Sequence, residues 1–443
     1  MDIGIIGAGI TGLTAAYELT KQGHHVTVYE ARPYAGGLAA GFHDARWEWY
    51  LDRFYHHWFA TDQDVISLIE ELGVRDRLFF PWPTTSLYYR GKIYPLDSPI
   101  PWLAFVPISQ VHRAIRVLQF TPLPLIDRLR VGLATFYLTL TRNWKPLEQV
   151  TVDEWMRRVA GQRAYDLWWK PLLISKFGAE NYRDVNMAWM WARAYKRSAR
   201  LGYFVGGFQA LVDLLVEQVR AQGGAVHLNT PVRGIQRADE ALHLELKTGH
   251  AAHQQIIATC SPHILRECTP ELPPDYATSL DALKSMGAVA LILALDRPLT
   301  AGHYWINLPK GEGDFSFPFM GLVEHTNYIG PEHYGGDHLI YCGDYLPPDH
   351  PYFGIEKEQL LEIYCPGLVK INPDFELDWV RASWMFTERY AQPVPTLDHS
   401  HHIPPLETPI PGLWMANMSQ VYPWDRGTNY GVELGRRVAR EMR

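Results

Sequence analysis

Two adjacent histidines stand in an aromatic stretch, LDRFYHHWFA, at residues 51–60. An imidazole can serve as a metal ligand, as a proton acceptor or donor, or as a packed ring. Neighbouring residues point to opposite faces of a strand and lie about 100° apart on a helix, so His56 and His57 are poorly placed to share one metal ion. Acid/base chemistry and packing both stay open for this pair, and the surrounding sequence has to decide between them.

A second group of residues suited to chemistry is the glycine motif in DIGIIGAGITGLTAAYELTKQGHHVTVYE. The pattern predicts a strand, a glycine turn, an amphipathic helix that ends near Gly23, and a second strand that closes on Glu30. Gly7 permits the tight turn, Gly9 lets the backbone approach a pyrophosphate, and Gly12 lets helix and strand pack closely. Glu30 can accept hydrogen bonds from ribose hydroxyls and disfavours a 2′-phosphate. This βαβ unit therefore predicts a dinucleotide site and argues against NADP.

Flavin binding is indicated by the next stretch, EARPYAGGLAA, at residues 30–40. Arg32 is followed by Gly36 and Gly37, which offer a second backbone approach to the same pyrophosphate. The stretch resembles the E-x-x-x-x-x-G-G signature of flavin-dependent amine oxidases, protoporphyrinogen oxidases and phytoene desaturases. The resemblance implies an FAD-dependent oxidoreductase that holds FAD, extended, in this crevice.

Two later segments resemble the same superfamily. In LGYFVGGFQALVDLLVEQVRAQGGAVHLNTPVRGI, the resemblance implies that Val232 offers backbone contacts to the adenine. In GLWMANMSQVYPWDRGTNYGVELGRRVARE, it implies a helix that begins near Thr428 and points its positive end at the flavin pyrimidine edge. Family members usually carry an acidic residue where this chain has Asn417, so the ribityl contact is expected from an amide. The residues expected to bind FAD are Gly7, Gly9, Ile10, Thr11, Gly12, Glu30, Ala31, Arg32, Gly36, Gly37, Leu38, Val232, Asn417, Gly427, Thr428 and Asn429.

The resemblance also gives the histidine stretch a place, on the path from the pyrophosphate to the isoalloxazine and the substrate mouth. We expect Tyr55, with His56 or His57, to line the substrate side, while the other histidine packs backwards. An imidazole with an ordinary pKa near about 6.5 could accept or donate a proton there as hydride leaves. The alternative is that both rings are structural and pack beside Phe54, Tyr55 and Trp58.

The fold class that follows is α/β, with a discontinuous Rossmann-type FAD-binding domain at residues 1–77, 201–278 and 386–443. Residues 78–200 and 279–385 are expected to form a substrate-binding domain of mixed sheet plus helical cap. The apolar run MGAVALILALD is the clearest strand of that sheet.

Three reactions or roles fit the resemblance. The first is hydride transfer to flavin from a bulky apolar or cyclic small molecule. The alternative is an FAD-containing isomerase without net redox change, similar to UDP-galactopyranose mutase, for which Arg426 beside the flavin helix would be suited. A flavin-binding scaffold without turnover is the third.

Composition sets outer limits on function. The chain has 443 residues, 47% of them hydrophobic, which is enough for two or more domains. A formal charge of -7 argues against a nucleic-acid partner. Four cysteines without C-x-x-C spacing favour a reducing, cytoplasmic location, and no signal peptide or spanning segment is expected.

Residues 98–141 read as two amphipathic, locally basic helices after Trp102 and Phe105. One apolar face would hold Val111, Ile115 and Leu118, and the other Ile126, Leu129, Leu133 and Leu140. Such stripes usually pack against neighbouring helices, so an ordinary cap is expected. Peripheral contact with a membrane through these residues is the alternative.

Two further groups invite a ligand. The tryptophans at 168, 169, 189 and 191 are expected to pack in the interior rather than line a flat cavity; on the second interpretation Arg193, Arg197 or Arg200 would meet an acidic group. The stretch LDHSHH at 397–402 has no recognised ligand spacing, so no metal site is expected there.

Overall fold

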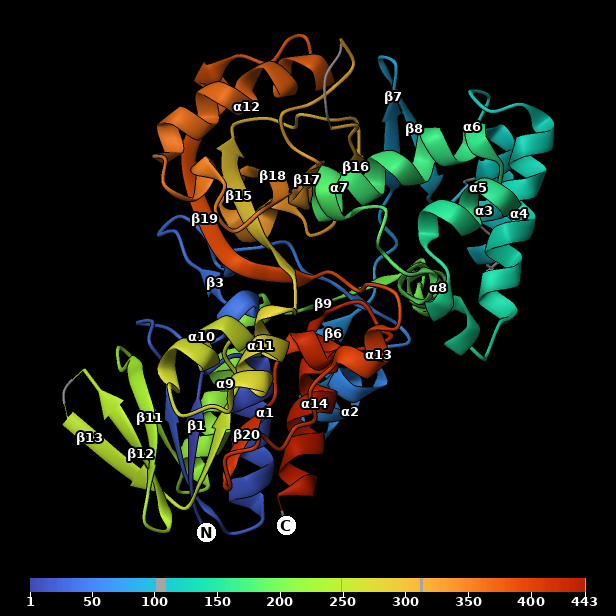
Figure 1. Cartoon of the computed structure of the whole chain (residues 1–443). Coiled ribbons are helices and arrows are strands. Elements are labelled where there is room, and N and C mark those ends of the chain that lie inside the picture. The colour runs from blue at the N-terminus through green and yellow to red at the C-terminus, as the bar shows by residue number, and fades with distance from the viewer. Residues whose placement is uncertain (101–108, 248, 311–313, 443) are drawn as a thin grey trace.

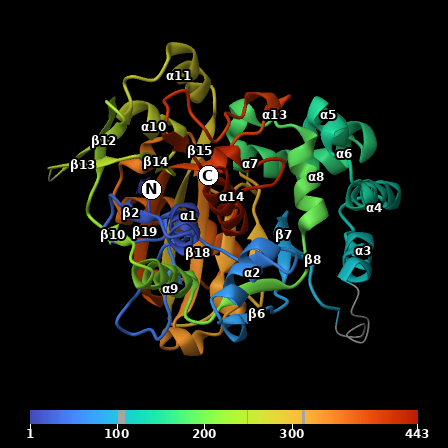
Figure 2. The same ribbon diagram turned by 90° about the horizontal axis from the view of Figure 1, so that it is seen from below.

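The computed structural model describes residues 1–100, 109–247, 249–310 and 314–442, and two large sheets organise it, one in each half of Figure 1. Helices α3 to α8 form a third body at one side, which we call the helical lobe (Figure 2). Trp102 and Phe105 lie outside the described residues.

The lower sheet in Figure 1 has five strands in the order β10-β2-β1-β14-β20. Its strands are β1 (Asp2–Ile6), β2 (His25–Tyr29), β10 (Ala225–His227), β14 (Gln255–Ala258) and β20 (Leu413–Met415). All four pairings are parallel. A parallel sheet is covered on both faces, which is why β1 is an almost unbroken apolar run. The predicted α/β, Rossmann-type fold is confirmed, and its strands come from three separate stretches of the chain.

Helices α1 (Ile10–Lys21), α9 (Phe208–Ala221) and α14 (Thr428–Glu441) cover this sheet. Helix α1 packs against both of the others. A side chain at Gly435 would place its Cβ 2.6 Å from the carbonyl oxygen of Thr11, so this glycine allows α14 to lie close to α1. The first and last helices of the chain therefore stand side by side.

A small antiparallel meander follows β10, and the sequence-based expectation contains no such unit. It consists of β11 (Val232–Ala238), β12 (Ala241–Leu246) and β13 (Gly249–His253), and it precedes β14. Helices α10 (Pro262–Cys268) and α11 (Pro274–Asp281) come after β14.

The upper sheet has seven strands in the order β19-β15-β18-β17-β16-β7-β8. They are β7 (Thr85–Tyr89), β8 (Lys92–Asp97), β15 (Ser285–Leu295), β16 (Trp305–Asn307), β17 (Gly321–Glu324), β18 (His338–Leu346) and β19 (Val380–Pro393). Helix α12 (Lys357–Ile371) packs on β15 and β19. The strand predicted from MGAVALILALD is confirmed as β15. Because β19 crosses residues 385 and 386, one predicted domain boundary falls inside a strand, and the boundaries as a whole stay predictions.

The β7–β8 hairpin lies where a helical cap was expected to begin. Its two-residue turn uses Arg90 and Gly91, with φ values of 46° and 79°. A turn with two positive φ angles matches the right-handed twist of the flanking strands, so the hairpin is locally favoured. Its first strand then joins the sheet by pairing with β16, and only the residues after it are helical.

The helical lobe contains α3 (Ser109–Gln119), α4 (Leu125–Leu140), α5 (Val152–Val159), α6 (Gln162–Ala164), α7 (Lys170–Asn181) and α8 (Met187–Lys196). Its interior is aromatic: Tyr165, Phe177, Trp189 and Trp191 are all buried. Helix α8 packs on α4 and leads back to the lower half of the molecule. One side-chain cap fixes its start, since the Asn186 side chain accepts a hydrogen bond from the Trp189 N–H.

Short strands hold the histidine stretch between the halves. Strands β3 (Gly41–Phe42) and β4 (Leu51–Asp52) pair with each other, and β9 (Leu201–Phe204) pairs with β5 (Trp58–Phe59) and β6 (Leu78–Phe79). Helix α2 (Gln63–Glu71) follows β5 and packs on α14. The stretch 51–60 is thus anchored at both of its ends.

Candidate active site

The glycine turn between β1 and α1 separates glycines that the fold needs from one that it does not. A Cβ at Gly7 would lie 2.6 Å from Thr259 Oγ1, and one at Gly12 would lie 2.1 Å from the carbonyl oxygen of Gly7. A Cβ at Gly9 would meet only the Cα of Gly37, at 3.9 Å. Packing within the protein therefore does not explain Gly9, whereas close approach of a ligand to the backbone does.

Glu30 ends β2 beside this turn and is 8% exposed. One carboxylate oxygen accepts a hydrogen bond from the Ala8 N–H at 2.8 Å, and the other accepts one from the Arg32 N–H at 2.9 Å. The Arg32 side chain turns away and pairs with Glu388 at 2.6 Å. The carboxylate is thus fixed at the edge of the turn with lone pairs left for hydroxyl donors, and Arg32 reaches the site through its backbone.

The second glycine pair lies against the first turn. The Gly36 N–H donates to the carbonyl oxygen of Ala8 at 2.8 Å, and Gly36 and Gly37 have φ values of 118° and 58°. These left-handed conformations favour glycine. The next residue, Leu38, lines a cavity that is described below. The backbone thus runs from the dinucleotide turn straight towards the centre of the molecule.

Three expected cofactor residues have structural contacts of their own. Ile10 and Thr11 lie in the first turn of α1 and face Gly431 of α14, whose Cβ would meet their side chains at 3.2 and 3.3 Å. Val232 begins β11, and two residues earlier the Thr230 N–H donates to the carbonyl oxygen of Glu30 at 2.7 Å. The Val232 segment therefore does lie beside Glu30. Ala31, next to Glu30, is exposed.

The carboxyl-terminal segment also lies at the site. Asn417 follows β20; its Oδ1 accepts from the Ser419 N–H at 3.0 Å, and its Nδ2 is buried without a hydrogen-bond partner among the described residues. Helix α14 begins at Thr428 as predicted, and Thr428 Oγ1 accepts from the Trp58 indole at 2.6 Å. The Asn429 side chain instead binds α2, accepting from the Val65 N–H and donating to Asp64.

These features fit an extended dinucleotide. Helices α1 and α14 each begin on a glycine, Gly9 and Gly427, without a side-chain cap and without an acidic residue in the first turn. Their first N–H groups and positive dipole ends are therefore left for anionic groups of a ligand. A glycine with free space at its Cβ, a buried carboxylate and an unpaired amide donor complete a set that suits pyrophosphate, ribose and ribityl groups.

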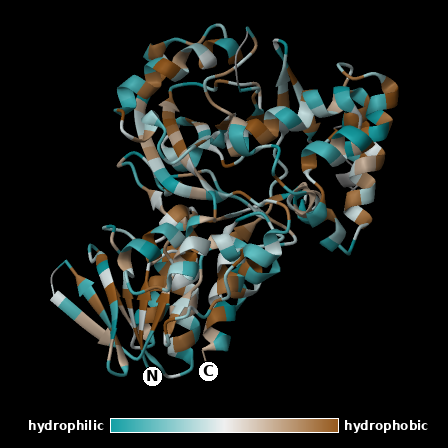
Figure 3. Cartoon of the chain, in the orientation of Figure 1, coloured by the Kyte–Doolittle hydropathy of each residue, from teal (hydrophilic) through white to brown (hydrophobic). Residues whose placement is uncertain are grey.

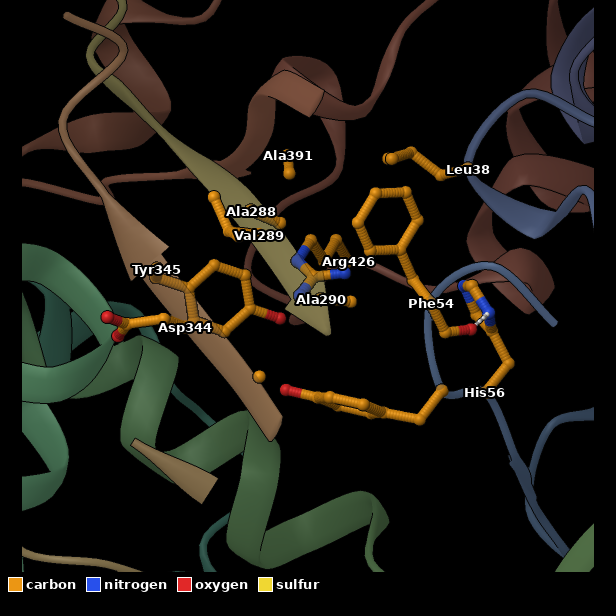
Figure 4. Close-up of a pocket in the computed structure, with 12 residues that line it drawn as sticks. Leu38, Phe54, His56, Ala288, Val289, Ala290, Asp344, Tyr345, Ala391 and Arg426 are labelled. Carbon is orange, nitrogen blue, oxygen red and sulfur yellow. Dashed lines mark hydrogen bonds between the residues drawn. The ribbon is translucent and has the colours of Figure 1, made fainter. Parts of the chain in front are cut away.

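A chamber of about 220 Å³ lies where α14 meets the upper sheet and the helical lobe. A smaller cavity of about 30 Å³ adjoins it and includes Leu38; both share Tyr55, His56, Tyr345 and Arg426 in their walls. Figure 4 shows Arg426 at the centre of the smaller cavity, between Phe54 and Tyr345. The residues lining the chamber are Tyr55, His56, His57, Trp58, Phe59, Asp62, Thr85, Leu172, Lys176, Ala192, Arg193, Lys196, Arg197, Leu201, Tyr304, Trp305, Asn307, Met320, Tyr345, Asp425, Arg426, Gly427, Thr428, Asn429 and Tyr430.

Both histidines of the opening stretch border this chamber, so neither packs backwards. His56 Nδ1 lies 2.5 Å from the carbonyl oxygen of Phe54, and His57 Nδ1 lies 3.3 Å from the Tyr304 hydroxyl. Burial, helped by the charge of Arg426, lowers the pKa of His56 to about 4. Burial, with Arg197 and other nearby cations, lowers the pKa of His57 to about 3. Both rings are therefore neutral at pH 7, whereas an ordinary imidazole titrates near about 6.5.

Tyr55 stands beside them with its ring edge-on to Trp305, at a centroid distance of 4.7 Å. A Cβ at Gly343 of β18 would approach this ring to 2.7 Å, so the glycine makes room for it. Burial raises the pKa of Tyr55 to about 12, although the charge of Arg426 opposes the rise. The phenol is therefore protonated and can donate a hydrogen bond into the chamber.

A cluster of charges that was not predicted forms the opposite wall. Lys176 of α7 and Arg193 of α8 both pair with Asp425, at 3.1 and 2.5 Å. Burial would raise the pKa of Asp425, but the charges of Lys176 and Arg193 outweigh burial and lower it. Burial lowers the pKa of Lys176 to about 7, and that of Arg426 to about 10. Arg193 and Arg426 could be named separately from the sequence, whereas Lys176 and Asp425 were not singled out. The cluster could not be recognised because its four residues come from α7, α8 and the loop before α14, which are distant in sequence.

The four tryptophans pack as expected. None of them lines either cavity, and Trp169, Trp189 and Trp191 are 9%, 2% and 2% exposed. The Trp189 indole donates to Asp425 at 3.1 Å, so it supports the chamber from behind. Arg193 and Arg197 do line the chamber, but Arg200 does not.

Two further expectations concern metal ligands and membrane-spanning helices. Among the described residues, no group of three or more His, Cys, Asp or Glu side chains is arranged to hold a metal ion. The LDHSHH stretch forms the short helix α13 (His399–His402), where His399 packs on Tyr422. No helix in the described parts of the chain is both long and apolar enough to cross a membrane.

Known proteins are similar to this chain in sequence or in fold. The family described as flavin containing amine oxidoreductase matches residues 10–443. A "Probable zeta-carotene desaturase" from Synechococcus elongatus is 24% identical over 488 aligned positions, which cover 100% of this chain and 98% of the relative. The crystal structure of a "Putative protoporphyrinogen oxidase" from Exiguobacterium sp. has a TM-score of 0.77 at 16% identity and covers 99% of this chain and 98% of its own. Reduced UDP-galactopyranose mutase has a TM-score of 0.72 at 17% identity, covering 100% and 93%. At these identities the structural likenesses establish the fold alone.

Proposed function

This chain belongs to the flavin-containing amine oxidoreductase family and is an FAD-dependent oxidoreductase, and we propose that it takes a hydride from a bulky, largely apolar substrate held in the chamber. One observation carries the proposal. The groove formed by the glycine turn at 7–12 and the pair Gly36 and Gly37 leads to Leu38, which lines the smaller cavity, and this cavity shares Tyr55, His56 and Arg426 with the chamber. The chemistry that bound FAD would supply is two-electron redox, with hydride accepted from substrate and electrons passed to an acceptor.

The chamber wall supports an apolar substrate. Tyr304, Trp305 and Met320 of the upper sheet face Leu172 of α7 and Phe59 of β5 across it. Aromatic side chains bury large flat surfaces and prefer stacked or edge-on partners, which suits cyclic or conjugated molecules. The Leu172 and Phe59 side chains on this side of the chamber also offer no hydrogen-bonding groups that would hold water next to the reacting carbon. The expected roles of the cofactor residues and of the chamber residues both stay proposals.

We assign the polar contacts with substrate to Tyr55, His56 and His57. The phenol of Tyr55 donates, while the neutral imidazoles can accept a hydrogen bond or the proton that leaves as hydride departs. Their low pKa values make each ring a weak base that is already unprotonated at pH 7. Positioning of the substrate is thus the larger part of their role.

The experiment is anaerobic mixing of the FAD-loaded protein with a panel of amines, porphyrinogens, carotenoids and polyprenyl sugars, followed by flavin absorbance. Loss of the oxidised flavin bands with one class, and product formed in equal amount, would support the proposal. If no class bleaches the flavin while dithionite does, hydride transfer from these substrates is wrong.

An isomerase without net redox change is the second candidate, and the cationic wall around Asp425 favours it, because such charges suit a nucleotide diphosphate. Steady-state turnover separates the two. An oxidoreductase consumes an electron acceptor in proportion to product, whereas an isomerase needs only catalytic pre-reduction.

We further propose that the helical lobe contacts a membrane surface that contains anionic lipids. Helix α4 exposes a row of large apolar side chains on its outer face, which is part of the apolar edge of the lobe in Figure 3. They are Leu125 (58% exposed), Ile126 (59%), Leu129 (48%), Leu133 (69%), Phe136 (62%), Tyr137 (52%) and Leu140 (63%). The opposite face, with Val131, Ala134 and Leu138, is the one that packs. The stripe expected to pack therefore points outward.

Charge favours a lipid surface over a second protein chain. Arg128 lies on α4, and the exposed Arg142 and Lys145 follow its end. The only acid of the helix, Asp127, is on the buried face and pairs with Arg163 at 3.1 Å. Exposed apolar residues with a basic fringe suit the headgroup region of an anionic bilayer. Helix α8 packs on α4 and also lines the chamber, so a membrane at α4 would lie near a route for apolar substrates.

Sedimentation with phosphatidylglycerol vesicles tests this contact. The parent should pellet with these vesicles and less with neutral phosphatidylcholine vesicles, and Leu133→Ser with Phe136→Ser should remove most binding. Leu377→Ser, at another exposed leucine (56%), is the matched control. If the double variant pellets as well as the parent, or if it only converts a dimer to a monomer, the lipid assignment is wrong.

A further inference from the structure

We propose that the chamber binds an oxyanion, a phosphate or carboxylate group of the substrate, between Lys176, Arg193 and Arg426, so that the substrate is an anion with an apolar body and not an amine. This inference rests on the proposed function, because it names the substrate class of the same chamber.

The charges in this wall do not balance. Lys176 and Arg193 share a single carboxylate, Asp425, and the Arg426 side chain lines the same chamber without a carboxylate partner. No other acidic side chain among the described residues pairs with any of the three cations. Asp425 already accepts from Lys176, Arg193, the Trp189 indole and the Arg426 backbone N–H. The cluster thus holds two positive charges more than it holds negative ones.

Arg426 is the least compensated of the three. Its Nε donates to the side-chain oxygen of Gln392 at 2.8 Å, and its guanidinium lies 5.1 Å from the centre of the Tyr345 ring. Neither partner carries a negative charge. The remaining guanidinium donors face the two cavities that Arg426 lines.

A second site in the molecule shows why this imbalance points to a ligand. Asp337 also pairs with two cations, Arg46 and Arg381, but Arg46 has a second carboxylate, Asp44, as a partner. The two arginine side chains are also 38% and 45% exposed, so water can stabilise their charge. The Lys176 side chain is only 8% exposed, so its charge has to be stabilised by another group or lost. Leaving a buried cation unpaired is costly, and an oxyanion removes that cost.

The chemistry of the donors defines the ligand. An ammonium gives a compact point charge, and two guanidinium groups give planar forks that match the geometry of phosphate and carboxylate oxygens. Leu172 and Met320 continue the wall beyond the cations and suit the apolar part of the substrate. An ammonium substrate would be repelled by the same wall. Asp425 acts as the internal counter-ion, which a bound oxyanion would join or displace from Arg193.

Calorimetric titration of the FAD-loaded protein tests the site, with pyrophosphate, propionate and methylammonium as probes at constant ionic strength and about pH 6. We expect one saturable site for pyrophosphate or propionate, and the stronger of the two identifies a phosphate or a carboxylate. Methylammonium should not bind. Lys176→Met and Arg426→Gln should each weaken anion binding at least about tenfold. Lys170→Met, on the same helix but outside the chamber wall, and Arg200→Gln are the matched controls.

Asp425→Asn gives a result of opposite sign. Removing the internal counter-ion should strengthen anion binding, because all three cations become available. If Lys176→Met fails to fold, this variant still tests whether the chamber binds an anion. The inference is overturned if the anions bind the chamber variants and the controls alike, or if methylammonium is the only ligand. It is also overturned if Arg426→Gln loses FAD while Lys176→Met binds anions as the parent does, since Arg426 would then serve the cofactor.

The two proposals fail separately. Flavin reduced by an uncharged apolar substrate, without anion binding, would remove only this inference. Anion binding that depends on Lys176, in a protein whose flavin no substrate reduces, would remove only the hydride-transfer proposal.

Discussion

The cofactor groove reaches the smaller cavity at Leu38, and this cavity shares His56 and Arg426 with the chamber, yet groove and chamber are built differently. The groove is made of backbone: glycine turns, helix ends and one fixed carboxylate, Glu30. The chamber is made of side chains from the upper sheet, the short strands β5 and β9, α7, α8, and the loop and first residues of α14. In the groove, backbone N–H groups with partial positive charges would bind the negative charge of a ligand. In the chamber, the full positive charges of buried lysine and arginine side chains would do so. A backbone site tolerates almost no change at a few positions, and a side-chain site can change its ligand by exchanging one residue.

The sharpest test of this contrast places the same methyl group at two glycines of one turn. Gly12→Ala should cost at least about 3 kcal/mol of the free energy of unfolding, because its Cβ would lie 2.1 Å from a backbone oxygen. Gly9→Ala should keep nearly parental stability but lose FAD affinity at least about tenfold, because only the ligand approaches it. Thermal unfolding and FAD content after gel filtration measure the two effects. Full FAD content in Gly9→Ala would mean that the pyrophosphate lies elsewhere.

Replacement of the histidines tests the chamber side. His56→Gln or His57→Gln should slow flavin reduction by up to about 100-fold with FAD content unchanged, because each ring positions the substrate and acts only as a weak base. About 100-fold is the lower end of the range for a lost proton-transfer group. Because burial, with Arg426, lowers the pKa of His56 to about 4, the single-turnover rate should stay flat near pH 7 and fall only as pH drops through about 4. The rate falls at low pH because protonation of the imidazole removes the nitrogen lone pair that accepts a hydrogen bond or a proton. A rate that rises through about pH 6.5 in the parent, and not in a variant, would contradict the lowered pKa.

A pH titration of anion binding separates the two regions by charge. The pKa of Lys176 is lowered from its ordinary value to about 7, so its charged form is present below that pH and lost above it. The affinity for sulfate, whose own charge is constant in this range, should therefore fall by about tenfold as pH rises through about 7. Lys176→Met should show no such fall. FAD affinity, which depends on backbone groups, should not change over the same range.

The smallest expected effect concerns the helix end that both regions share. Thr428→Glu places a negative charge at the start of α14 and should lower the flavin reduction potential by tens of millivolts, since a helix-end charge is worth about 1–2 kcal/mol. Potentiometry of the FAD-loaded variant measures the shift. Thr428→Val is the control, because it also removes the hydrogen bond from Trp58. An unchanged potential in Thr428→Glu would show that α14 does not point at the flavin.

The sequence predicted the groove well for a physical reason. A backbone site needs glycines at fixed spacing, so Gly7, Gly9 and Gly12, the strand ends at Glu30 and the start of α14 at Thr428 could all be placed before the structure was known. Two of the expected residues use their side chains within the protein: the Asn429 side chain binds α2, and the Arg32 side chain pairs with Glu388. Their contacts with FAD stay predictions.

The residues of the chamber were harder to predict from the sequence. Lys176 and Asp425 are far apart in sequence. Their pairing can be recognised only in the folded structure, where α7 and the loop before α14 come together. The exposed face of α4 shows the complementary problem, because an apolar stripe has the same pattern whether it packs or faces outward. The β7–β8 hairpin, by contrast, could have been found from its Arg-Gly turn between alternating residues.

The position of β20 in the parallel sheet has a consequence for synthesis. During translation β1, α1 and β14 emerge long before β20 and α14, which supply the final strand of the sheet and the second helix against α1. Until then the ribosome-bound chain exposes an unpaired edge of β14 and an uncovered face of α1, both of which invite association with other chains. Capture of FAD can be completed only after α14 has folded onto α1. The yield of active enzyme should therefore depend on FAD and chaperone supply at the end of synthesis, and a messenger that is cut short before β20 should produce insoluble, colourless protein.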